Sequence, residues 1–124
     1  MTWLMVALGG ALGSVGRFGL GQALARFDAF PYGTLLANVL GSLVIGICAG
    51  LLVCEQSSKP AGLFLMAGFC GGFTTFSAFS LQTFELLEQQ AWLKAGGNVV
   101  LSVALCLLGT WLGFLLGQSL RKTA

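Results

Sequence analysis

The chain has 124 residues, of which 56% are hydrophobic and 8% are charged, and its mean hydropathy is +0.91. Because soluble domains carry roughly 25% charged residues, this composition excludes an ordinary soluble fold and indicates a membrane protein. A net charge of +2 gives no reason to expect a nucleic-acid partner. The apolar runs are long and lack two-residue alternation, which favours helices over a closed barrel, so we expect an all-α membrane protein.

Charged residues divide the chain into four long uncharged stretches, each near or above the roughly 20 residues that a spanning helix needs. We therefore predict a single four-helix transmembrane domain that covers residues 1–124. Its spans are expected at about 3–25, 33–53, 61–89 and 93–119. The first span lacks a basic leader and a small-residue cleavage site, so we expect a helix of the protein here rather than a signal peptide.

Small residues recur at intervals of four along three of the predicted helices. This spacing lets helix backbones approach closely in a membrane, and it indicates packing rather than function. The residues are Gly9 and Gly13 in the first helix, Ser42, Gly46 and Gly50 in the second, and Gly109, Gly113 and Gly117 in the fourth.

The second and fourth predicted helices each carry a stripe of uncharged polar side chains at intervals of four, hence on one helix face. Hydrogen bonds between membrane helices contribute only about 0.6 kcal/mol each, and they are the alternative explanation. Two extended stripes instead favour a polar pathway, since a buried amide such as Asn38 is costly in hydrocarbon. The stripes are Thr34, Asn38 and Ser42 on the second helix, and Asn98, Ser102, Cys106 and Thr110 on the fourth.

The chemistry of these stripes indicates the kind of solute. Amide and hydroxyl donors without a fixed positive charge suit a small anion that must be dehydrated but not trapped. A cation pathway would favour acidic rings, and a proton-coupled transporter needs a carboxylate inside the membrane. Glu85 and Glu88 lie only at the end of the third predicted span. The pattern therefore argues against coupled export.

The third predicted helix contains the segment GFCGGFTTFSAFS at residues 68–80, which is too apolar for a surface loop. Gly71 and Gly72 are expected to weaken the helix. The hydroxyls of Thr74, Thr75 and Ser77 are then expected to bond the backbone groups set free. A helix broken at mid-membrane is tolerated only where it is buried in protein or lines a cavity. Such a break offers carbonyl oxygens to a cation and a helix N-terminus to an anion.

Cysteine and histidine usage gives no sign of a metal-thiolate site or a catalytic centre. The chain has no histidine, and its cysteines, Cys48, Cys54, Cys70 and Cys106, show no C-x-x-C spacing. We interpret them as small apolar packing residues. Without histidine, and with acids only at helix ends, no nucleophile can be paired with a base, so we do not expect an enzyme.

The positive charges do not select an orientation in the membrane. One side, which holds both termini, carries Lys59, Arg121 and Lys122. The other side carries Arg26, Lys94 and, if its side chain reaches that far, Arg17. We therefore predict that both orientations insert in comparable numbers and form an antiparallel dimer with its two-fold axis in the membrane plane. A weak bias toward one orientation is the alternative.

Three motifs resemble those of the Fluc family of fluoride channels, also called CrcB. GFCGGFTTFSAFS at 68–80 is similar to the family's glycine-rich TTFS segment, which is the most specific of the three. GGALGSVGR at 9–17 resembles the glycine-and-arginine signature of the first helix, and GTLLANVLGS at 33–42 resembles the second-helix motif. The resemblance covers essentially all 124 residues.

This resemblance implies a dual-topology antiparallel homodimer in the inner (plasma) membrane of a microbe, with two parallel pores that conduct fluoride passively. It also implies a structural sodium ion at the dimer centre, held by backbone carbonyls that correspond to Gly71 and Thr74. Phe76 and Phe79 would flank fluoride with their ring edges, which are the positive part of a phenyl ring.

The other site residues follow from the resemblance together with the stripes. Asn38 would donate to fluoride, and Arg17 would anchor or line the vestibule. The rest of the fluoride pathway would comprise Ser77, Ser80 and Thr110, with Thr34 and Ser102 from the stripes. Two positions depart from the family pattern: Gln82 stands where many members have glutamate, and Asn98 where some have tyrosine.

Two other classes of membrane protein are alternatives. A small dual-topology multidrug exporter needs an acid in its first span, and residues 1–16 contain none. A non-transporting assembly protein would explain the glycines but not the polar stripes.

Overall fold

The computed structural model of the protein describes residues 1–27, 29–52 and 59–123, and this part of the chain is all helical. Four of its helices are long and apolar enough to cross a membrane, which confirms the predicted fold class at this level. They are α1 (Thr2–Ala23), α2 (Tyr32–Leu51), a third span over Pro60–Glu88, and α7 (Trp92–Thr123). The short helix η1 (Ala25–Phe27) follows α1.

The helices begin and end close to the predicted spans. The main difference is that α7 continues past residue 119 to Thr123. The predicted end of the second span at residue 53 lies outside the described residues, as do Asp28, Cys54 and Glu55.

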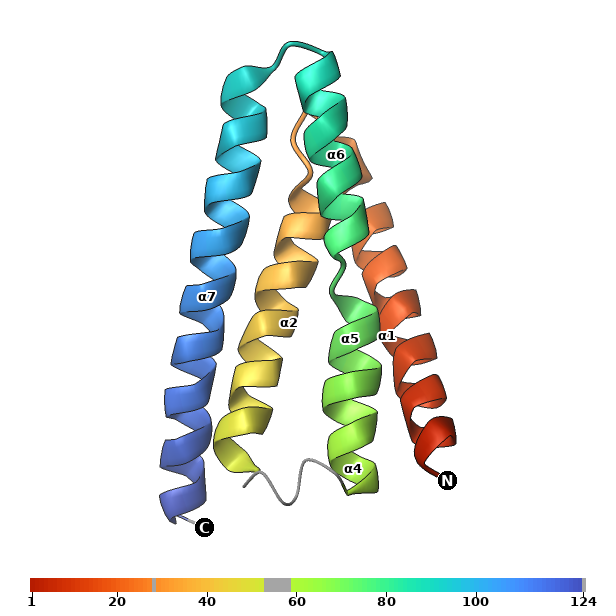
Figure 1. Ribbon diagram of the computed structural model, residues 1–124, viewed down its shortest axis with the longest axis vertical. Helices are drawn as coiled ribbons and strands as arrows, with labels where there is room; N and C mark the ends of the chain where they lie inside the picture. The colour runs from red at the N-terminus through yellow and green to blue at the C-terminus, as the bar shows by residue number, and fades with distance from the viewer. Residues whose placement is uncertain (28, 53–58, 124) are drawn as a thin grey trace.

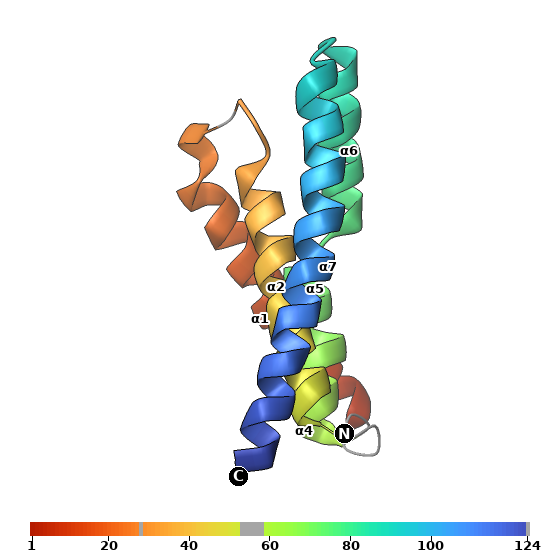
Figure 2. The ribbon, with the colours of Figure 1, turned by 90° about the vertical axis from the view of Figure 1, so that its left-hand side faces the viewer.

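The four spans run side by side, and both ends of the chain lie at the same end of the molecule (Figure 1). Helix α2 packs along α7, and α1 packs along the third span. Figure 2 shows that the other end divides into two arms. One arm holds the end of α1 and the start of α2, and the other holds α6 (Phe76–Glu88) and the start of α7.

Glycines bring these paired helices into backbone contact. A Cβ on Gly46 would overlap the carbonyl oxygen of Thr110, and a Cβ on Gly113 would overlap that of Leu43. Along α1, a Cβ on Gly9 would likewise overlap a backbone carbonyl of the third span. The prediction that these small residues serve close packing is therefore confirmed.

The third span is built from several segments. It begins with α4 (Pro60–Gly62), widens into the π-helix η2 (Leu63–Cys70), and continues as α5 (Gly71–Phe73). Thr74 and Thr75 then have extended backbones, with φ/ψ of −85°/156° and −153°/121°, before α6 begins at Phe76. We call these two residues the Thr74–Thr75 link.

The expectation that Gly71 and Gly72 open the helix is wrong. Gly71 has helical φ and ψ of −62° and −37°, and both glycines belong to α5. Gly72 instead allows close approach to α1, because a Cβ there would overlap the backbone carbonyl of Gly10. Glycine lowers helix propensity, but packing against a neighbouring helix keeps it helical here.

Candidate functional site

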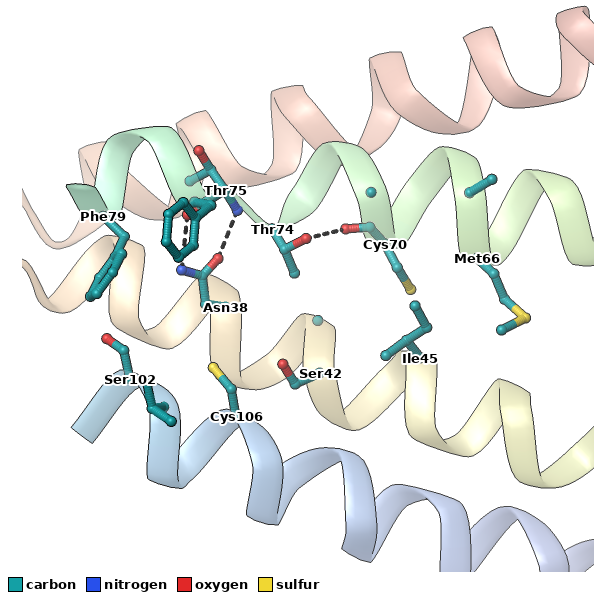
Figure 3. A pocket seen from close by; sticks show the side chains of 15 residues that line it. Asn38, Ser42, Ile45, Met66, Cys70, Thr74, Thr75, Phe79, Ser102 and Cys106 are labelled. Atoms are coloured by element: carbon teal, nitrogen blue, oxygen red, sulfur yellow. Dashed lines mark hydrogen bonds between the residues drawn. The ribbon is translucent and has the colours of Figure 1, made fainter. Parts of the chain in front are cut away.

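A cavity of about 580 Å³ lies beside the Thr74–Thr75 link. Figure 3 shows it bounded by the third span on one side and α7 on the other, with α2 between them. Among the described residues that line it, none is charged, and the polar side chains are amides, hydroxyls and thiols. They include Asn38 and Ser42 from α2, Cys70, Thr74 and Thr75 from the third span, and Ser102 and Cys106 from α7.

The structure brings some of the predicted site residues together at this cavity and leaves others outside it. The lining includes Asn38, Gly71, Thr74, Phe76, Phe79 and Ser102. Thr34, Ser77, Ser80, Thr110 and Arg17 do not line it. Ser77 and Ser80 are instead exposed on α6, so they lie on the surface of the single protomer.

Asn38 pairs with both backbone polar groups of Thr75 (Figure 3). Its Oδ1 accepts from the Thr75 N–H at 2.7 Å, and its Nδ2 donates to the Thr75 carbonyl at 3.1 Å. A primary amide has two N–H donors, so one N–H of Asn38 is left without a hydrogen-bond partner in the described part of the chain. The predicted donation from Asn38 to an ion therefore rests on this N–H.

Of the three hydroxyls predicted to bond freed backbone groups, only that of Thr75 does so. The Cys70 carbonyl bonded by Thr74 keeps its helical donor, the Thr74 N–H, and the Ser77 hydroxyl pairs with Thr75 Oγ1. Thr74 Oγ1 donates to the Cys70 carbonyl at 2.8 Å, at the end of the first helical half. Thr75 Oγ1 accepts from the Ala78 N–H at 3.3 Å and so forms the N-cap of α6. No hydrogen bond within the described residues uses the backbone N–H groups of Phe76 and Ser77, which form the positive, N-terminal end of the α6 dipole.

The link also changes the hydrogen bonds of two backbone carbonyls, one in the link and one just before it. In an unbroken helix, the Gly71 carbonyl accepts from the Thr75 N–H, and the Thr74 carbonyl accepts from the Ala78 N–H. Here those N–H groups bond to Asn38 Oδ1 and Thr75 Oγ1 instead. The carbonyls of Gly71 and Thr74 have therefore lost their helical partners.

The Gly72 carbonyl differs from these two because α1 supplies donors to it. Arg17 Nε donates to this oxygen at 3.2 Å, and Ser14 Oγ donates at 3.5 Å. Arg17 therefore anchors the third span, and it does so from the α1 side rather than from the cavity.

Two phenylalanines stand at the start of α6, on the cavity wall. The ring centroids of Phe76 and Phe79 lie 5.3 Å apart with an interplanar angle of 51°. Phe76 is 78% exposed on the single protomer. By contrast, Phe73 stacks on Phe69 at 5.7 Å, which is a packing contact.

Asn98 has a different environment from the rest of its predicted stripe. It is 1% exposed, and its Nδ2 donates to Thr83 Oγ1 at 2.8 Å, so it joins α7 to α6. Sequence reasoning missed Thr83. Its position in the sequence could have identified it. Thr83 and Asn98 are equally distant from the turn at Gln90 and Ala91, and such residues face each other in a helical hairpin.

The chain is similar to known proteins over almost its whole length. Residues 4–114 match the family model described as CrcB-like protein, Camphor Resistance (CrcB). Proteins named "Fluoride-specific ion channel FluC" are 50% identical in Opitutus terrae, with 97% of this chain and 95% of that protein covered, and 43% identical in Methylocella silvestris, with 98% and 97% covered. The corresponding protein of Paramagnetospirillum magneticum is 49% identical, with 91% and 92% covered. With its four apolar helices, the chain is a multi-pass membrane protein and belongs to the CrcB family.

Proposed function

We propose that this protein is a fluoride-specific ion channel that lets fluoride leave a bacterial cell passively through the inner membrane. The names of its relatives support the ion, and the cavity supports the mechanism. The observation that carries the proposal is a cavity that combines hydrogen-bond donors and phenyl rings with no charged lining residue. Such a lining can replace the water around a small anion without trapping it on a fixed charge.

The donors for fluoride gather at the start of α6. They are the unused N–H groups of Phe76 and Ser77, the second N–H of Asn38 and the hydroxyl of Ser77. The helix N-terminus adds a partial positive charge, and the ring edges of Phe76 and Phe79 add another favourable surface for an anion. Fluoride therefore meets several donors, and no charged side chain is among the described residues that line the cavity.

The remaining predicted pathway residues extend the polar track away from the cavity. These are Ser80 on α6, Thr34 on α2 and Thr110 on α7, whereas Ser102 lines the cavity itself. Because Ser77, Ser80 and Phe76 are exposed on the protomer, the track needs a second surface to enclose it. A second copy of this chain supplies that surface in our proposal.

That second copy has the opposite orientation. The balanced positive charges favour insertion both ways, and a two-fold axis in the membrane plane then gives the antiparallel dimer two equivalent pores. The third spans of the two copies meet at this axis, which places both Thr74–Thr75 links at mid-membrane. This position suits an irregular backbone, because it is buried in protein or lines a cavity.

The carbonyls of Gly71 and Thr74 fit a structural sodium ion at the dimer centre. Both oxygens have lost their helical partners at the link, and Gly71 is exposed on the protomer. Carbonyl oxygens are suitable ligands for a hard cation, and four become available when two copies meet. When bound, sodium supplies a positive potential beside the anion pathway.

Ion efflux from proteoliposomes tests the proposed function. Liposomes that contain the purified protein are expected to release fluoride down its gradient, while chloride is nearly retained. Protein-free liposomes loaded identically are the control. Chloride release as fast as fluoride release would overturn the selective-channel proposal, and fluoride release that requires a proton gradient would favour a coupled exporter.

A further inference from the structure

The Thr74–Thr75 link has side-chain partners on both of its sides, and both partners belong to the same protomer. Asn38 of α2 bonds the N–H and the carbonyl of Thr75, and Arg17 of α1 bonds the carbonyl of Gly72. We propose that Asn38 and Arg17 are positioning residues that set the conformation of the link within one protomer, before a second copy or an ion is present. This deepens the proposed channel function, on which only its consequence for transport rests.

Asn38 suits this role because a side-chain amide carries the same donor and acceptor as a backbone amide. The extended backbone of Thr75 takes its N–H out of the helical ladder, and inside a bilayer that group has no water to bond. One asparagine side chain satisfies this N–H and the neighbouring carbonyl together. Aspartate would keep the acceptor and lose the donor, and alanine would lose both.

Arg17 secures the other side of the link. A charged side chain within an apolar span is costly and needs a partner, and its partner is the Gly72 carbonyl. This oxygen lies in α5, near the end of the helical run that starts at Pro60, where the helix dipole is negative. The Arg17 charge and the Ser14 hydroxyl therefore both stabilise this helix end.

Together, the two residues determine which backbone groups remain available to ions. Asn38 removes the Thr75 N–H from the Gly71 carbonyl, and Arg17 occupies the Gly72 carbonyl. The Gly71 carbonyl then lacks its helical donor, whereas the Gly72 carbonyl is occupied. The carbonyls of Phe73 and Thr74 also lack their helical donors, because α6 begins at Phe76 and the Ala78 N–H bonds to Thr75 Oγ1. Positioning by α1 and α2 thus frees one of the proposed sodium ligands, Gly71, and removes Gly72 from the candidates without any contact to the ion.

Amide exchange at Thr75 tests the role of Asn38. In full-length protein labelled with 15N-threonine in lipid nanodiscs, we expect Asn38→Ala to accelerate hydrogen exchange of the Thr75 amide at least about tenfold, because its acceptor is lost. Asn38→Asp keeps an acceptor, so it is expected to preserve this protection. Ser42→Ala is the matched control, one turn further along α2 in the same cavity wall, and should leave Thr75 unchanged.

The outcomes separate positioning from direct ion binding. An Asn38 that only binds the ion would leave Thr75 exchange at the wild-type rate in Asn38→Ala, which would overturn the proposal. If the alanine variant does not assemble, Asn38→Asp decides: loss of Thr75 protection in that variant contradicts the assigned acceptor. Neither result depends on transport, so the proposal can fail while fluoride efflux stands, or the reverse.

The carbonyl carbon of Gly72 reports on Arg17. With 13C-carbonyl glycine, we expect Arg17→Met to shift the Gly72 signal upfield, because its strongest donor is removed, and Arg17→Lys to restore part of the shift. Ser14→Ala should move the signal less, since that bond is longer at 3.5 Å. An identical Gly72 signal in wild type, Arg17→Met and Arg17→Lys would overturn this part.

Sodium removal tests the claim that the protomer itself sets the link. Wild-type protein in sodium buffer and in N-methylglucamine buffer is expected to show the same Thr75 exchange rate. Loss of Thr75 protection without sodium would show that the ion shapes the link, and the proposal would then be wrong.

Discussion

At the residue scale, some polar and aromatic side chains are buried or hydrogen-bonded within one protomer, whereas others are exposed on it. Asn98 is buried and bonded to Thr83, so we expect it to stabilise the fold. Phe76 is 78% exposed beside unused N–H groups, so we expect it to act on the ion. These two expectations lead to opposite results in stability and transport measurements.

Replacing the phenylalanines of α6 is expected to slow transport without loss of assembly. Phe76→Ile and Phe79→Ile each remove a positive ring edge, whose interaction is on the scale of about 1 kcal/mol, so fluoride efflux should fall about fivefold. Phe84→Ile, on the same helix but outside the cavity wall, is the control. Gel filtration checks assembly. Wild-type efflux in both variants would assign these rings to packing.

Replacing Thr83 is expected to lower stability and leave transport largely intact. Thr83→Val removes the acceptor of the buried Asn98 Nδ2, which costs about 1 kcal/mol. Titration with denaturing detergent measures the free energy of unfolding. In an Asn98→Leu background the same change should cost little, because no donor is left unpaired. Equal costs in both backgrounds would contradict the pairing.

Part of the residue-level site was predictable, because the polar stripe indicated Asn38 and the family resemblance indicated Phe76 and Phe79. Asn38, Phe76 and Phe79 do line one cavity. The pairing of Asn38 with Thr75 was not predictable, since it depends on an extended backbone that appears only when α1, α2 and the third span pack together. A stripe pattern also cannot separate Asn98, which bonds to α6, from Ser102, which faces the cavity.

At the element scale, glycine spacing determines which helices touch. The α2 and α7 backbones meet through Gly46 and Gly113, and this contact was predictable because small residues at intervals of four have one structural use in membranes. The π-helix Leu63–Cys70 was not predictable. No local composition specifies its hydrogen-bond register, although the segment packs along α1.

Two glycine substitutions in α7 should have opposite effects. Gly113→Ala places a Cβ against the Leu43 carbonyl and separates the helices, which should cost about 1–3 kcal/mol of unfolding free energy. Gly96→Ala meets no atom within 4 Å, so it should gain up to about 1 kcal/mol from helix propensity. Detergent-titration curves compare the two. Equal effects would contradict backbone contact at Gly113.

At the scale of the whole molecule, a single protomer has two separate arms at one end (Figure 2), and three of its predicted pathway residues, Phe76, Ser77 and Ser80, are exposed. Many large apolar side chains on its helices are also exposed, such as Leu107 at 68% and Val100 at 65%. Lipid accounts for the apolar surface, but exposed Ser77 and Ser80 on α6 are poor partners for hydrocarbon. The second copy that we propose would cover these hydroxyls.

Labelling at the chain end tests the proposed arrangement of the two copies. In a cysteine-free background, Lys122→Cys should react with an impermeant maleimide from both sides of the membrane in roughly equal amounts, because the charges do not favour one orientation. Adding three lysines after residue 122 is the control, since it should fix one orientation. Reaction from one side only in the parent variant would contradict the antiparallel dimer.

The position of the link's partners along the chain has a consequence for biosynthesis. Arg17 and Asn38 both precede the link in sequence, so they are already in the membrane when residues 71–76 leave the ribosome. The link can therefore close while α7 is still being translated. Helix α7 then packs on the glycines of α2, and the newly made subunit would present a complete link to the second copy that we propose.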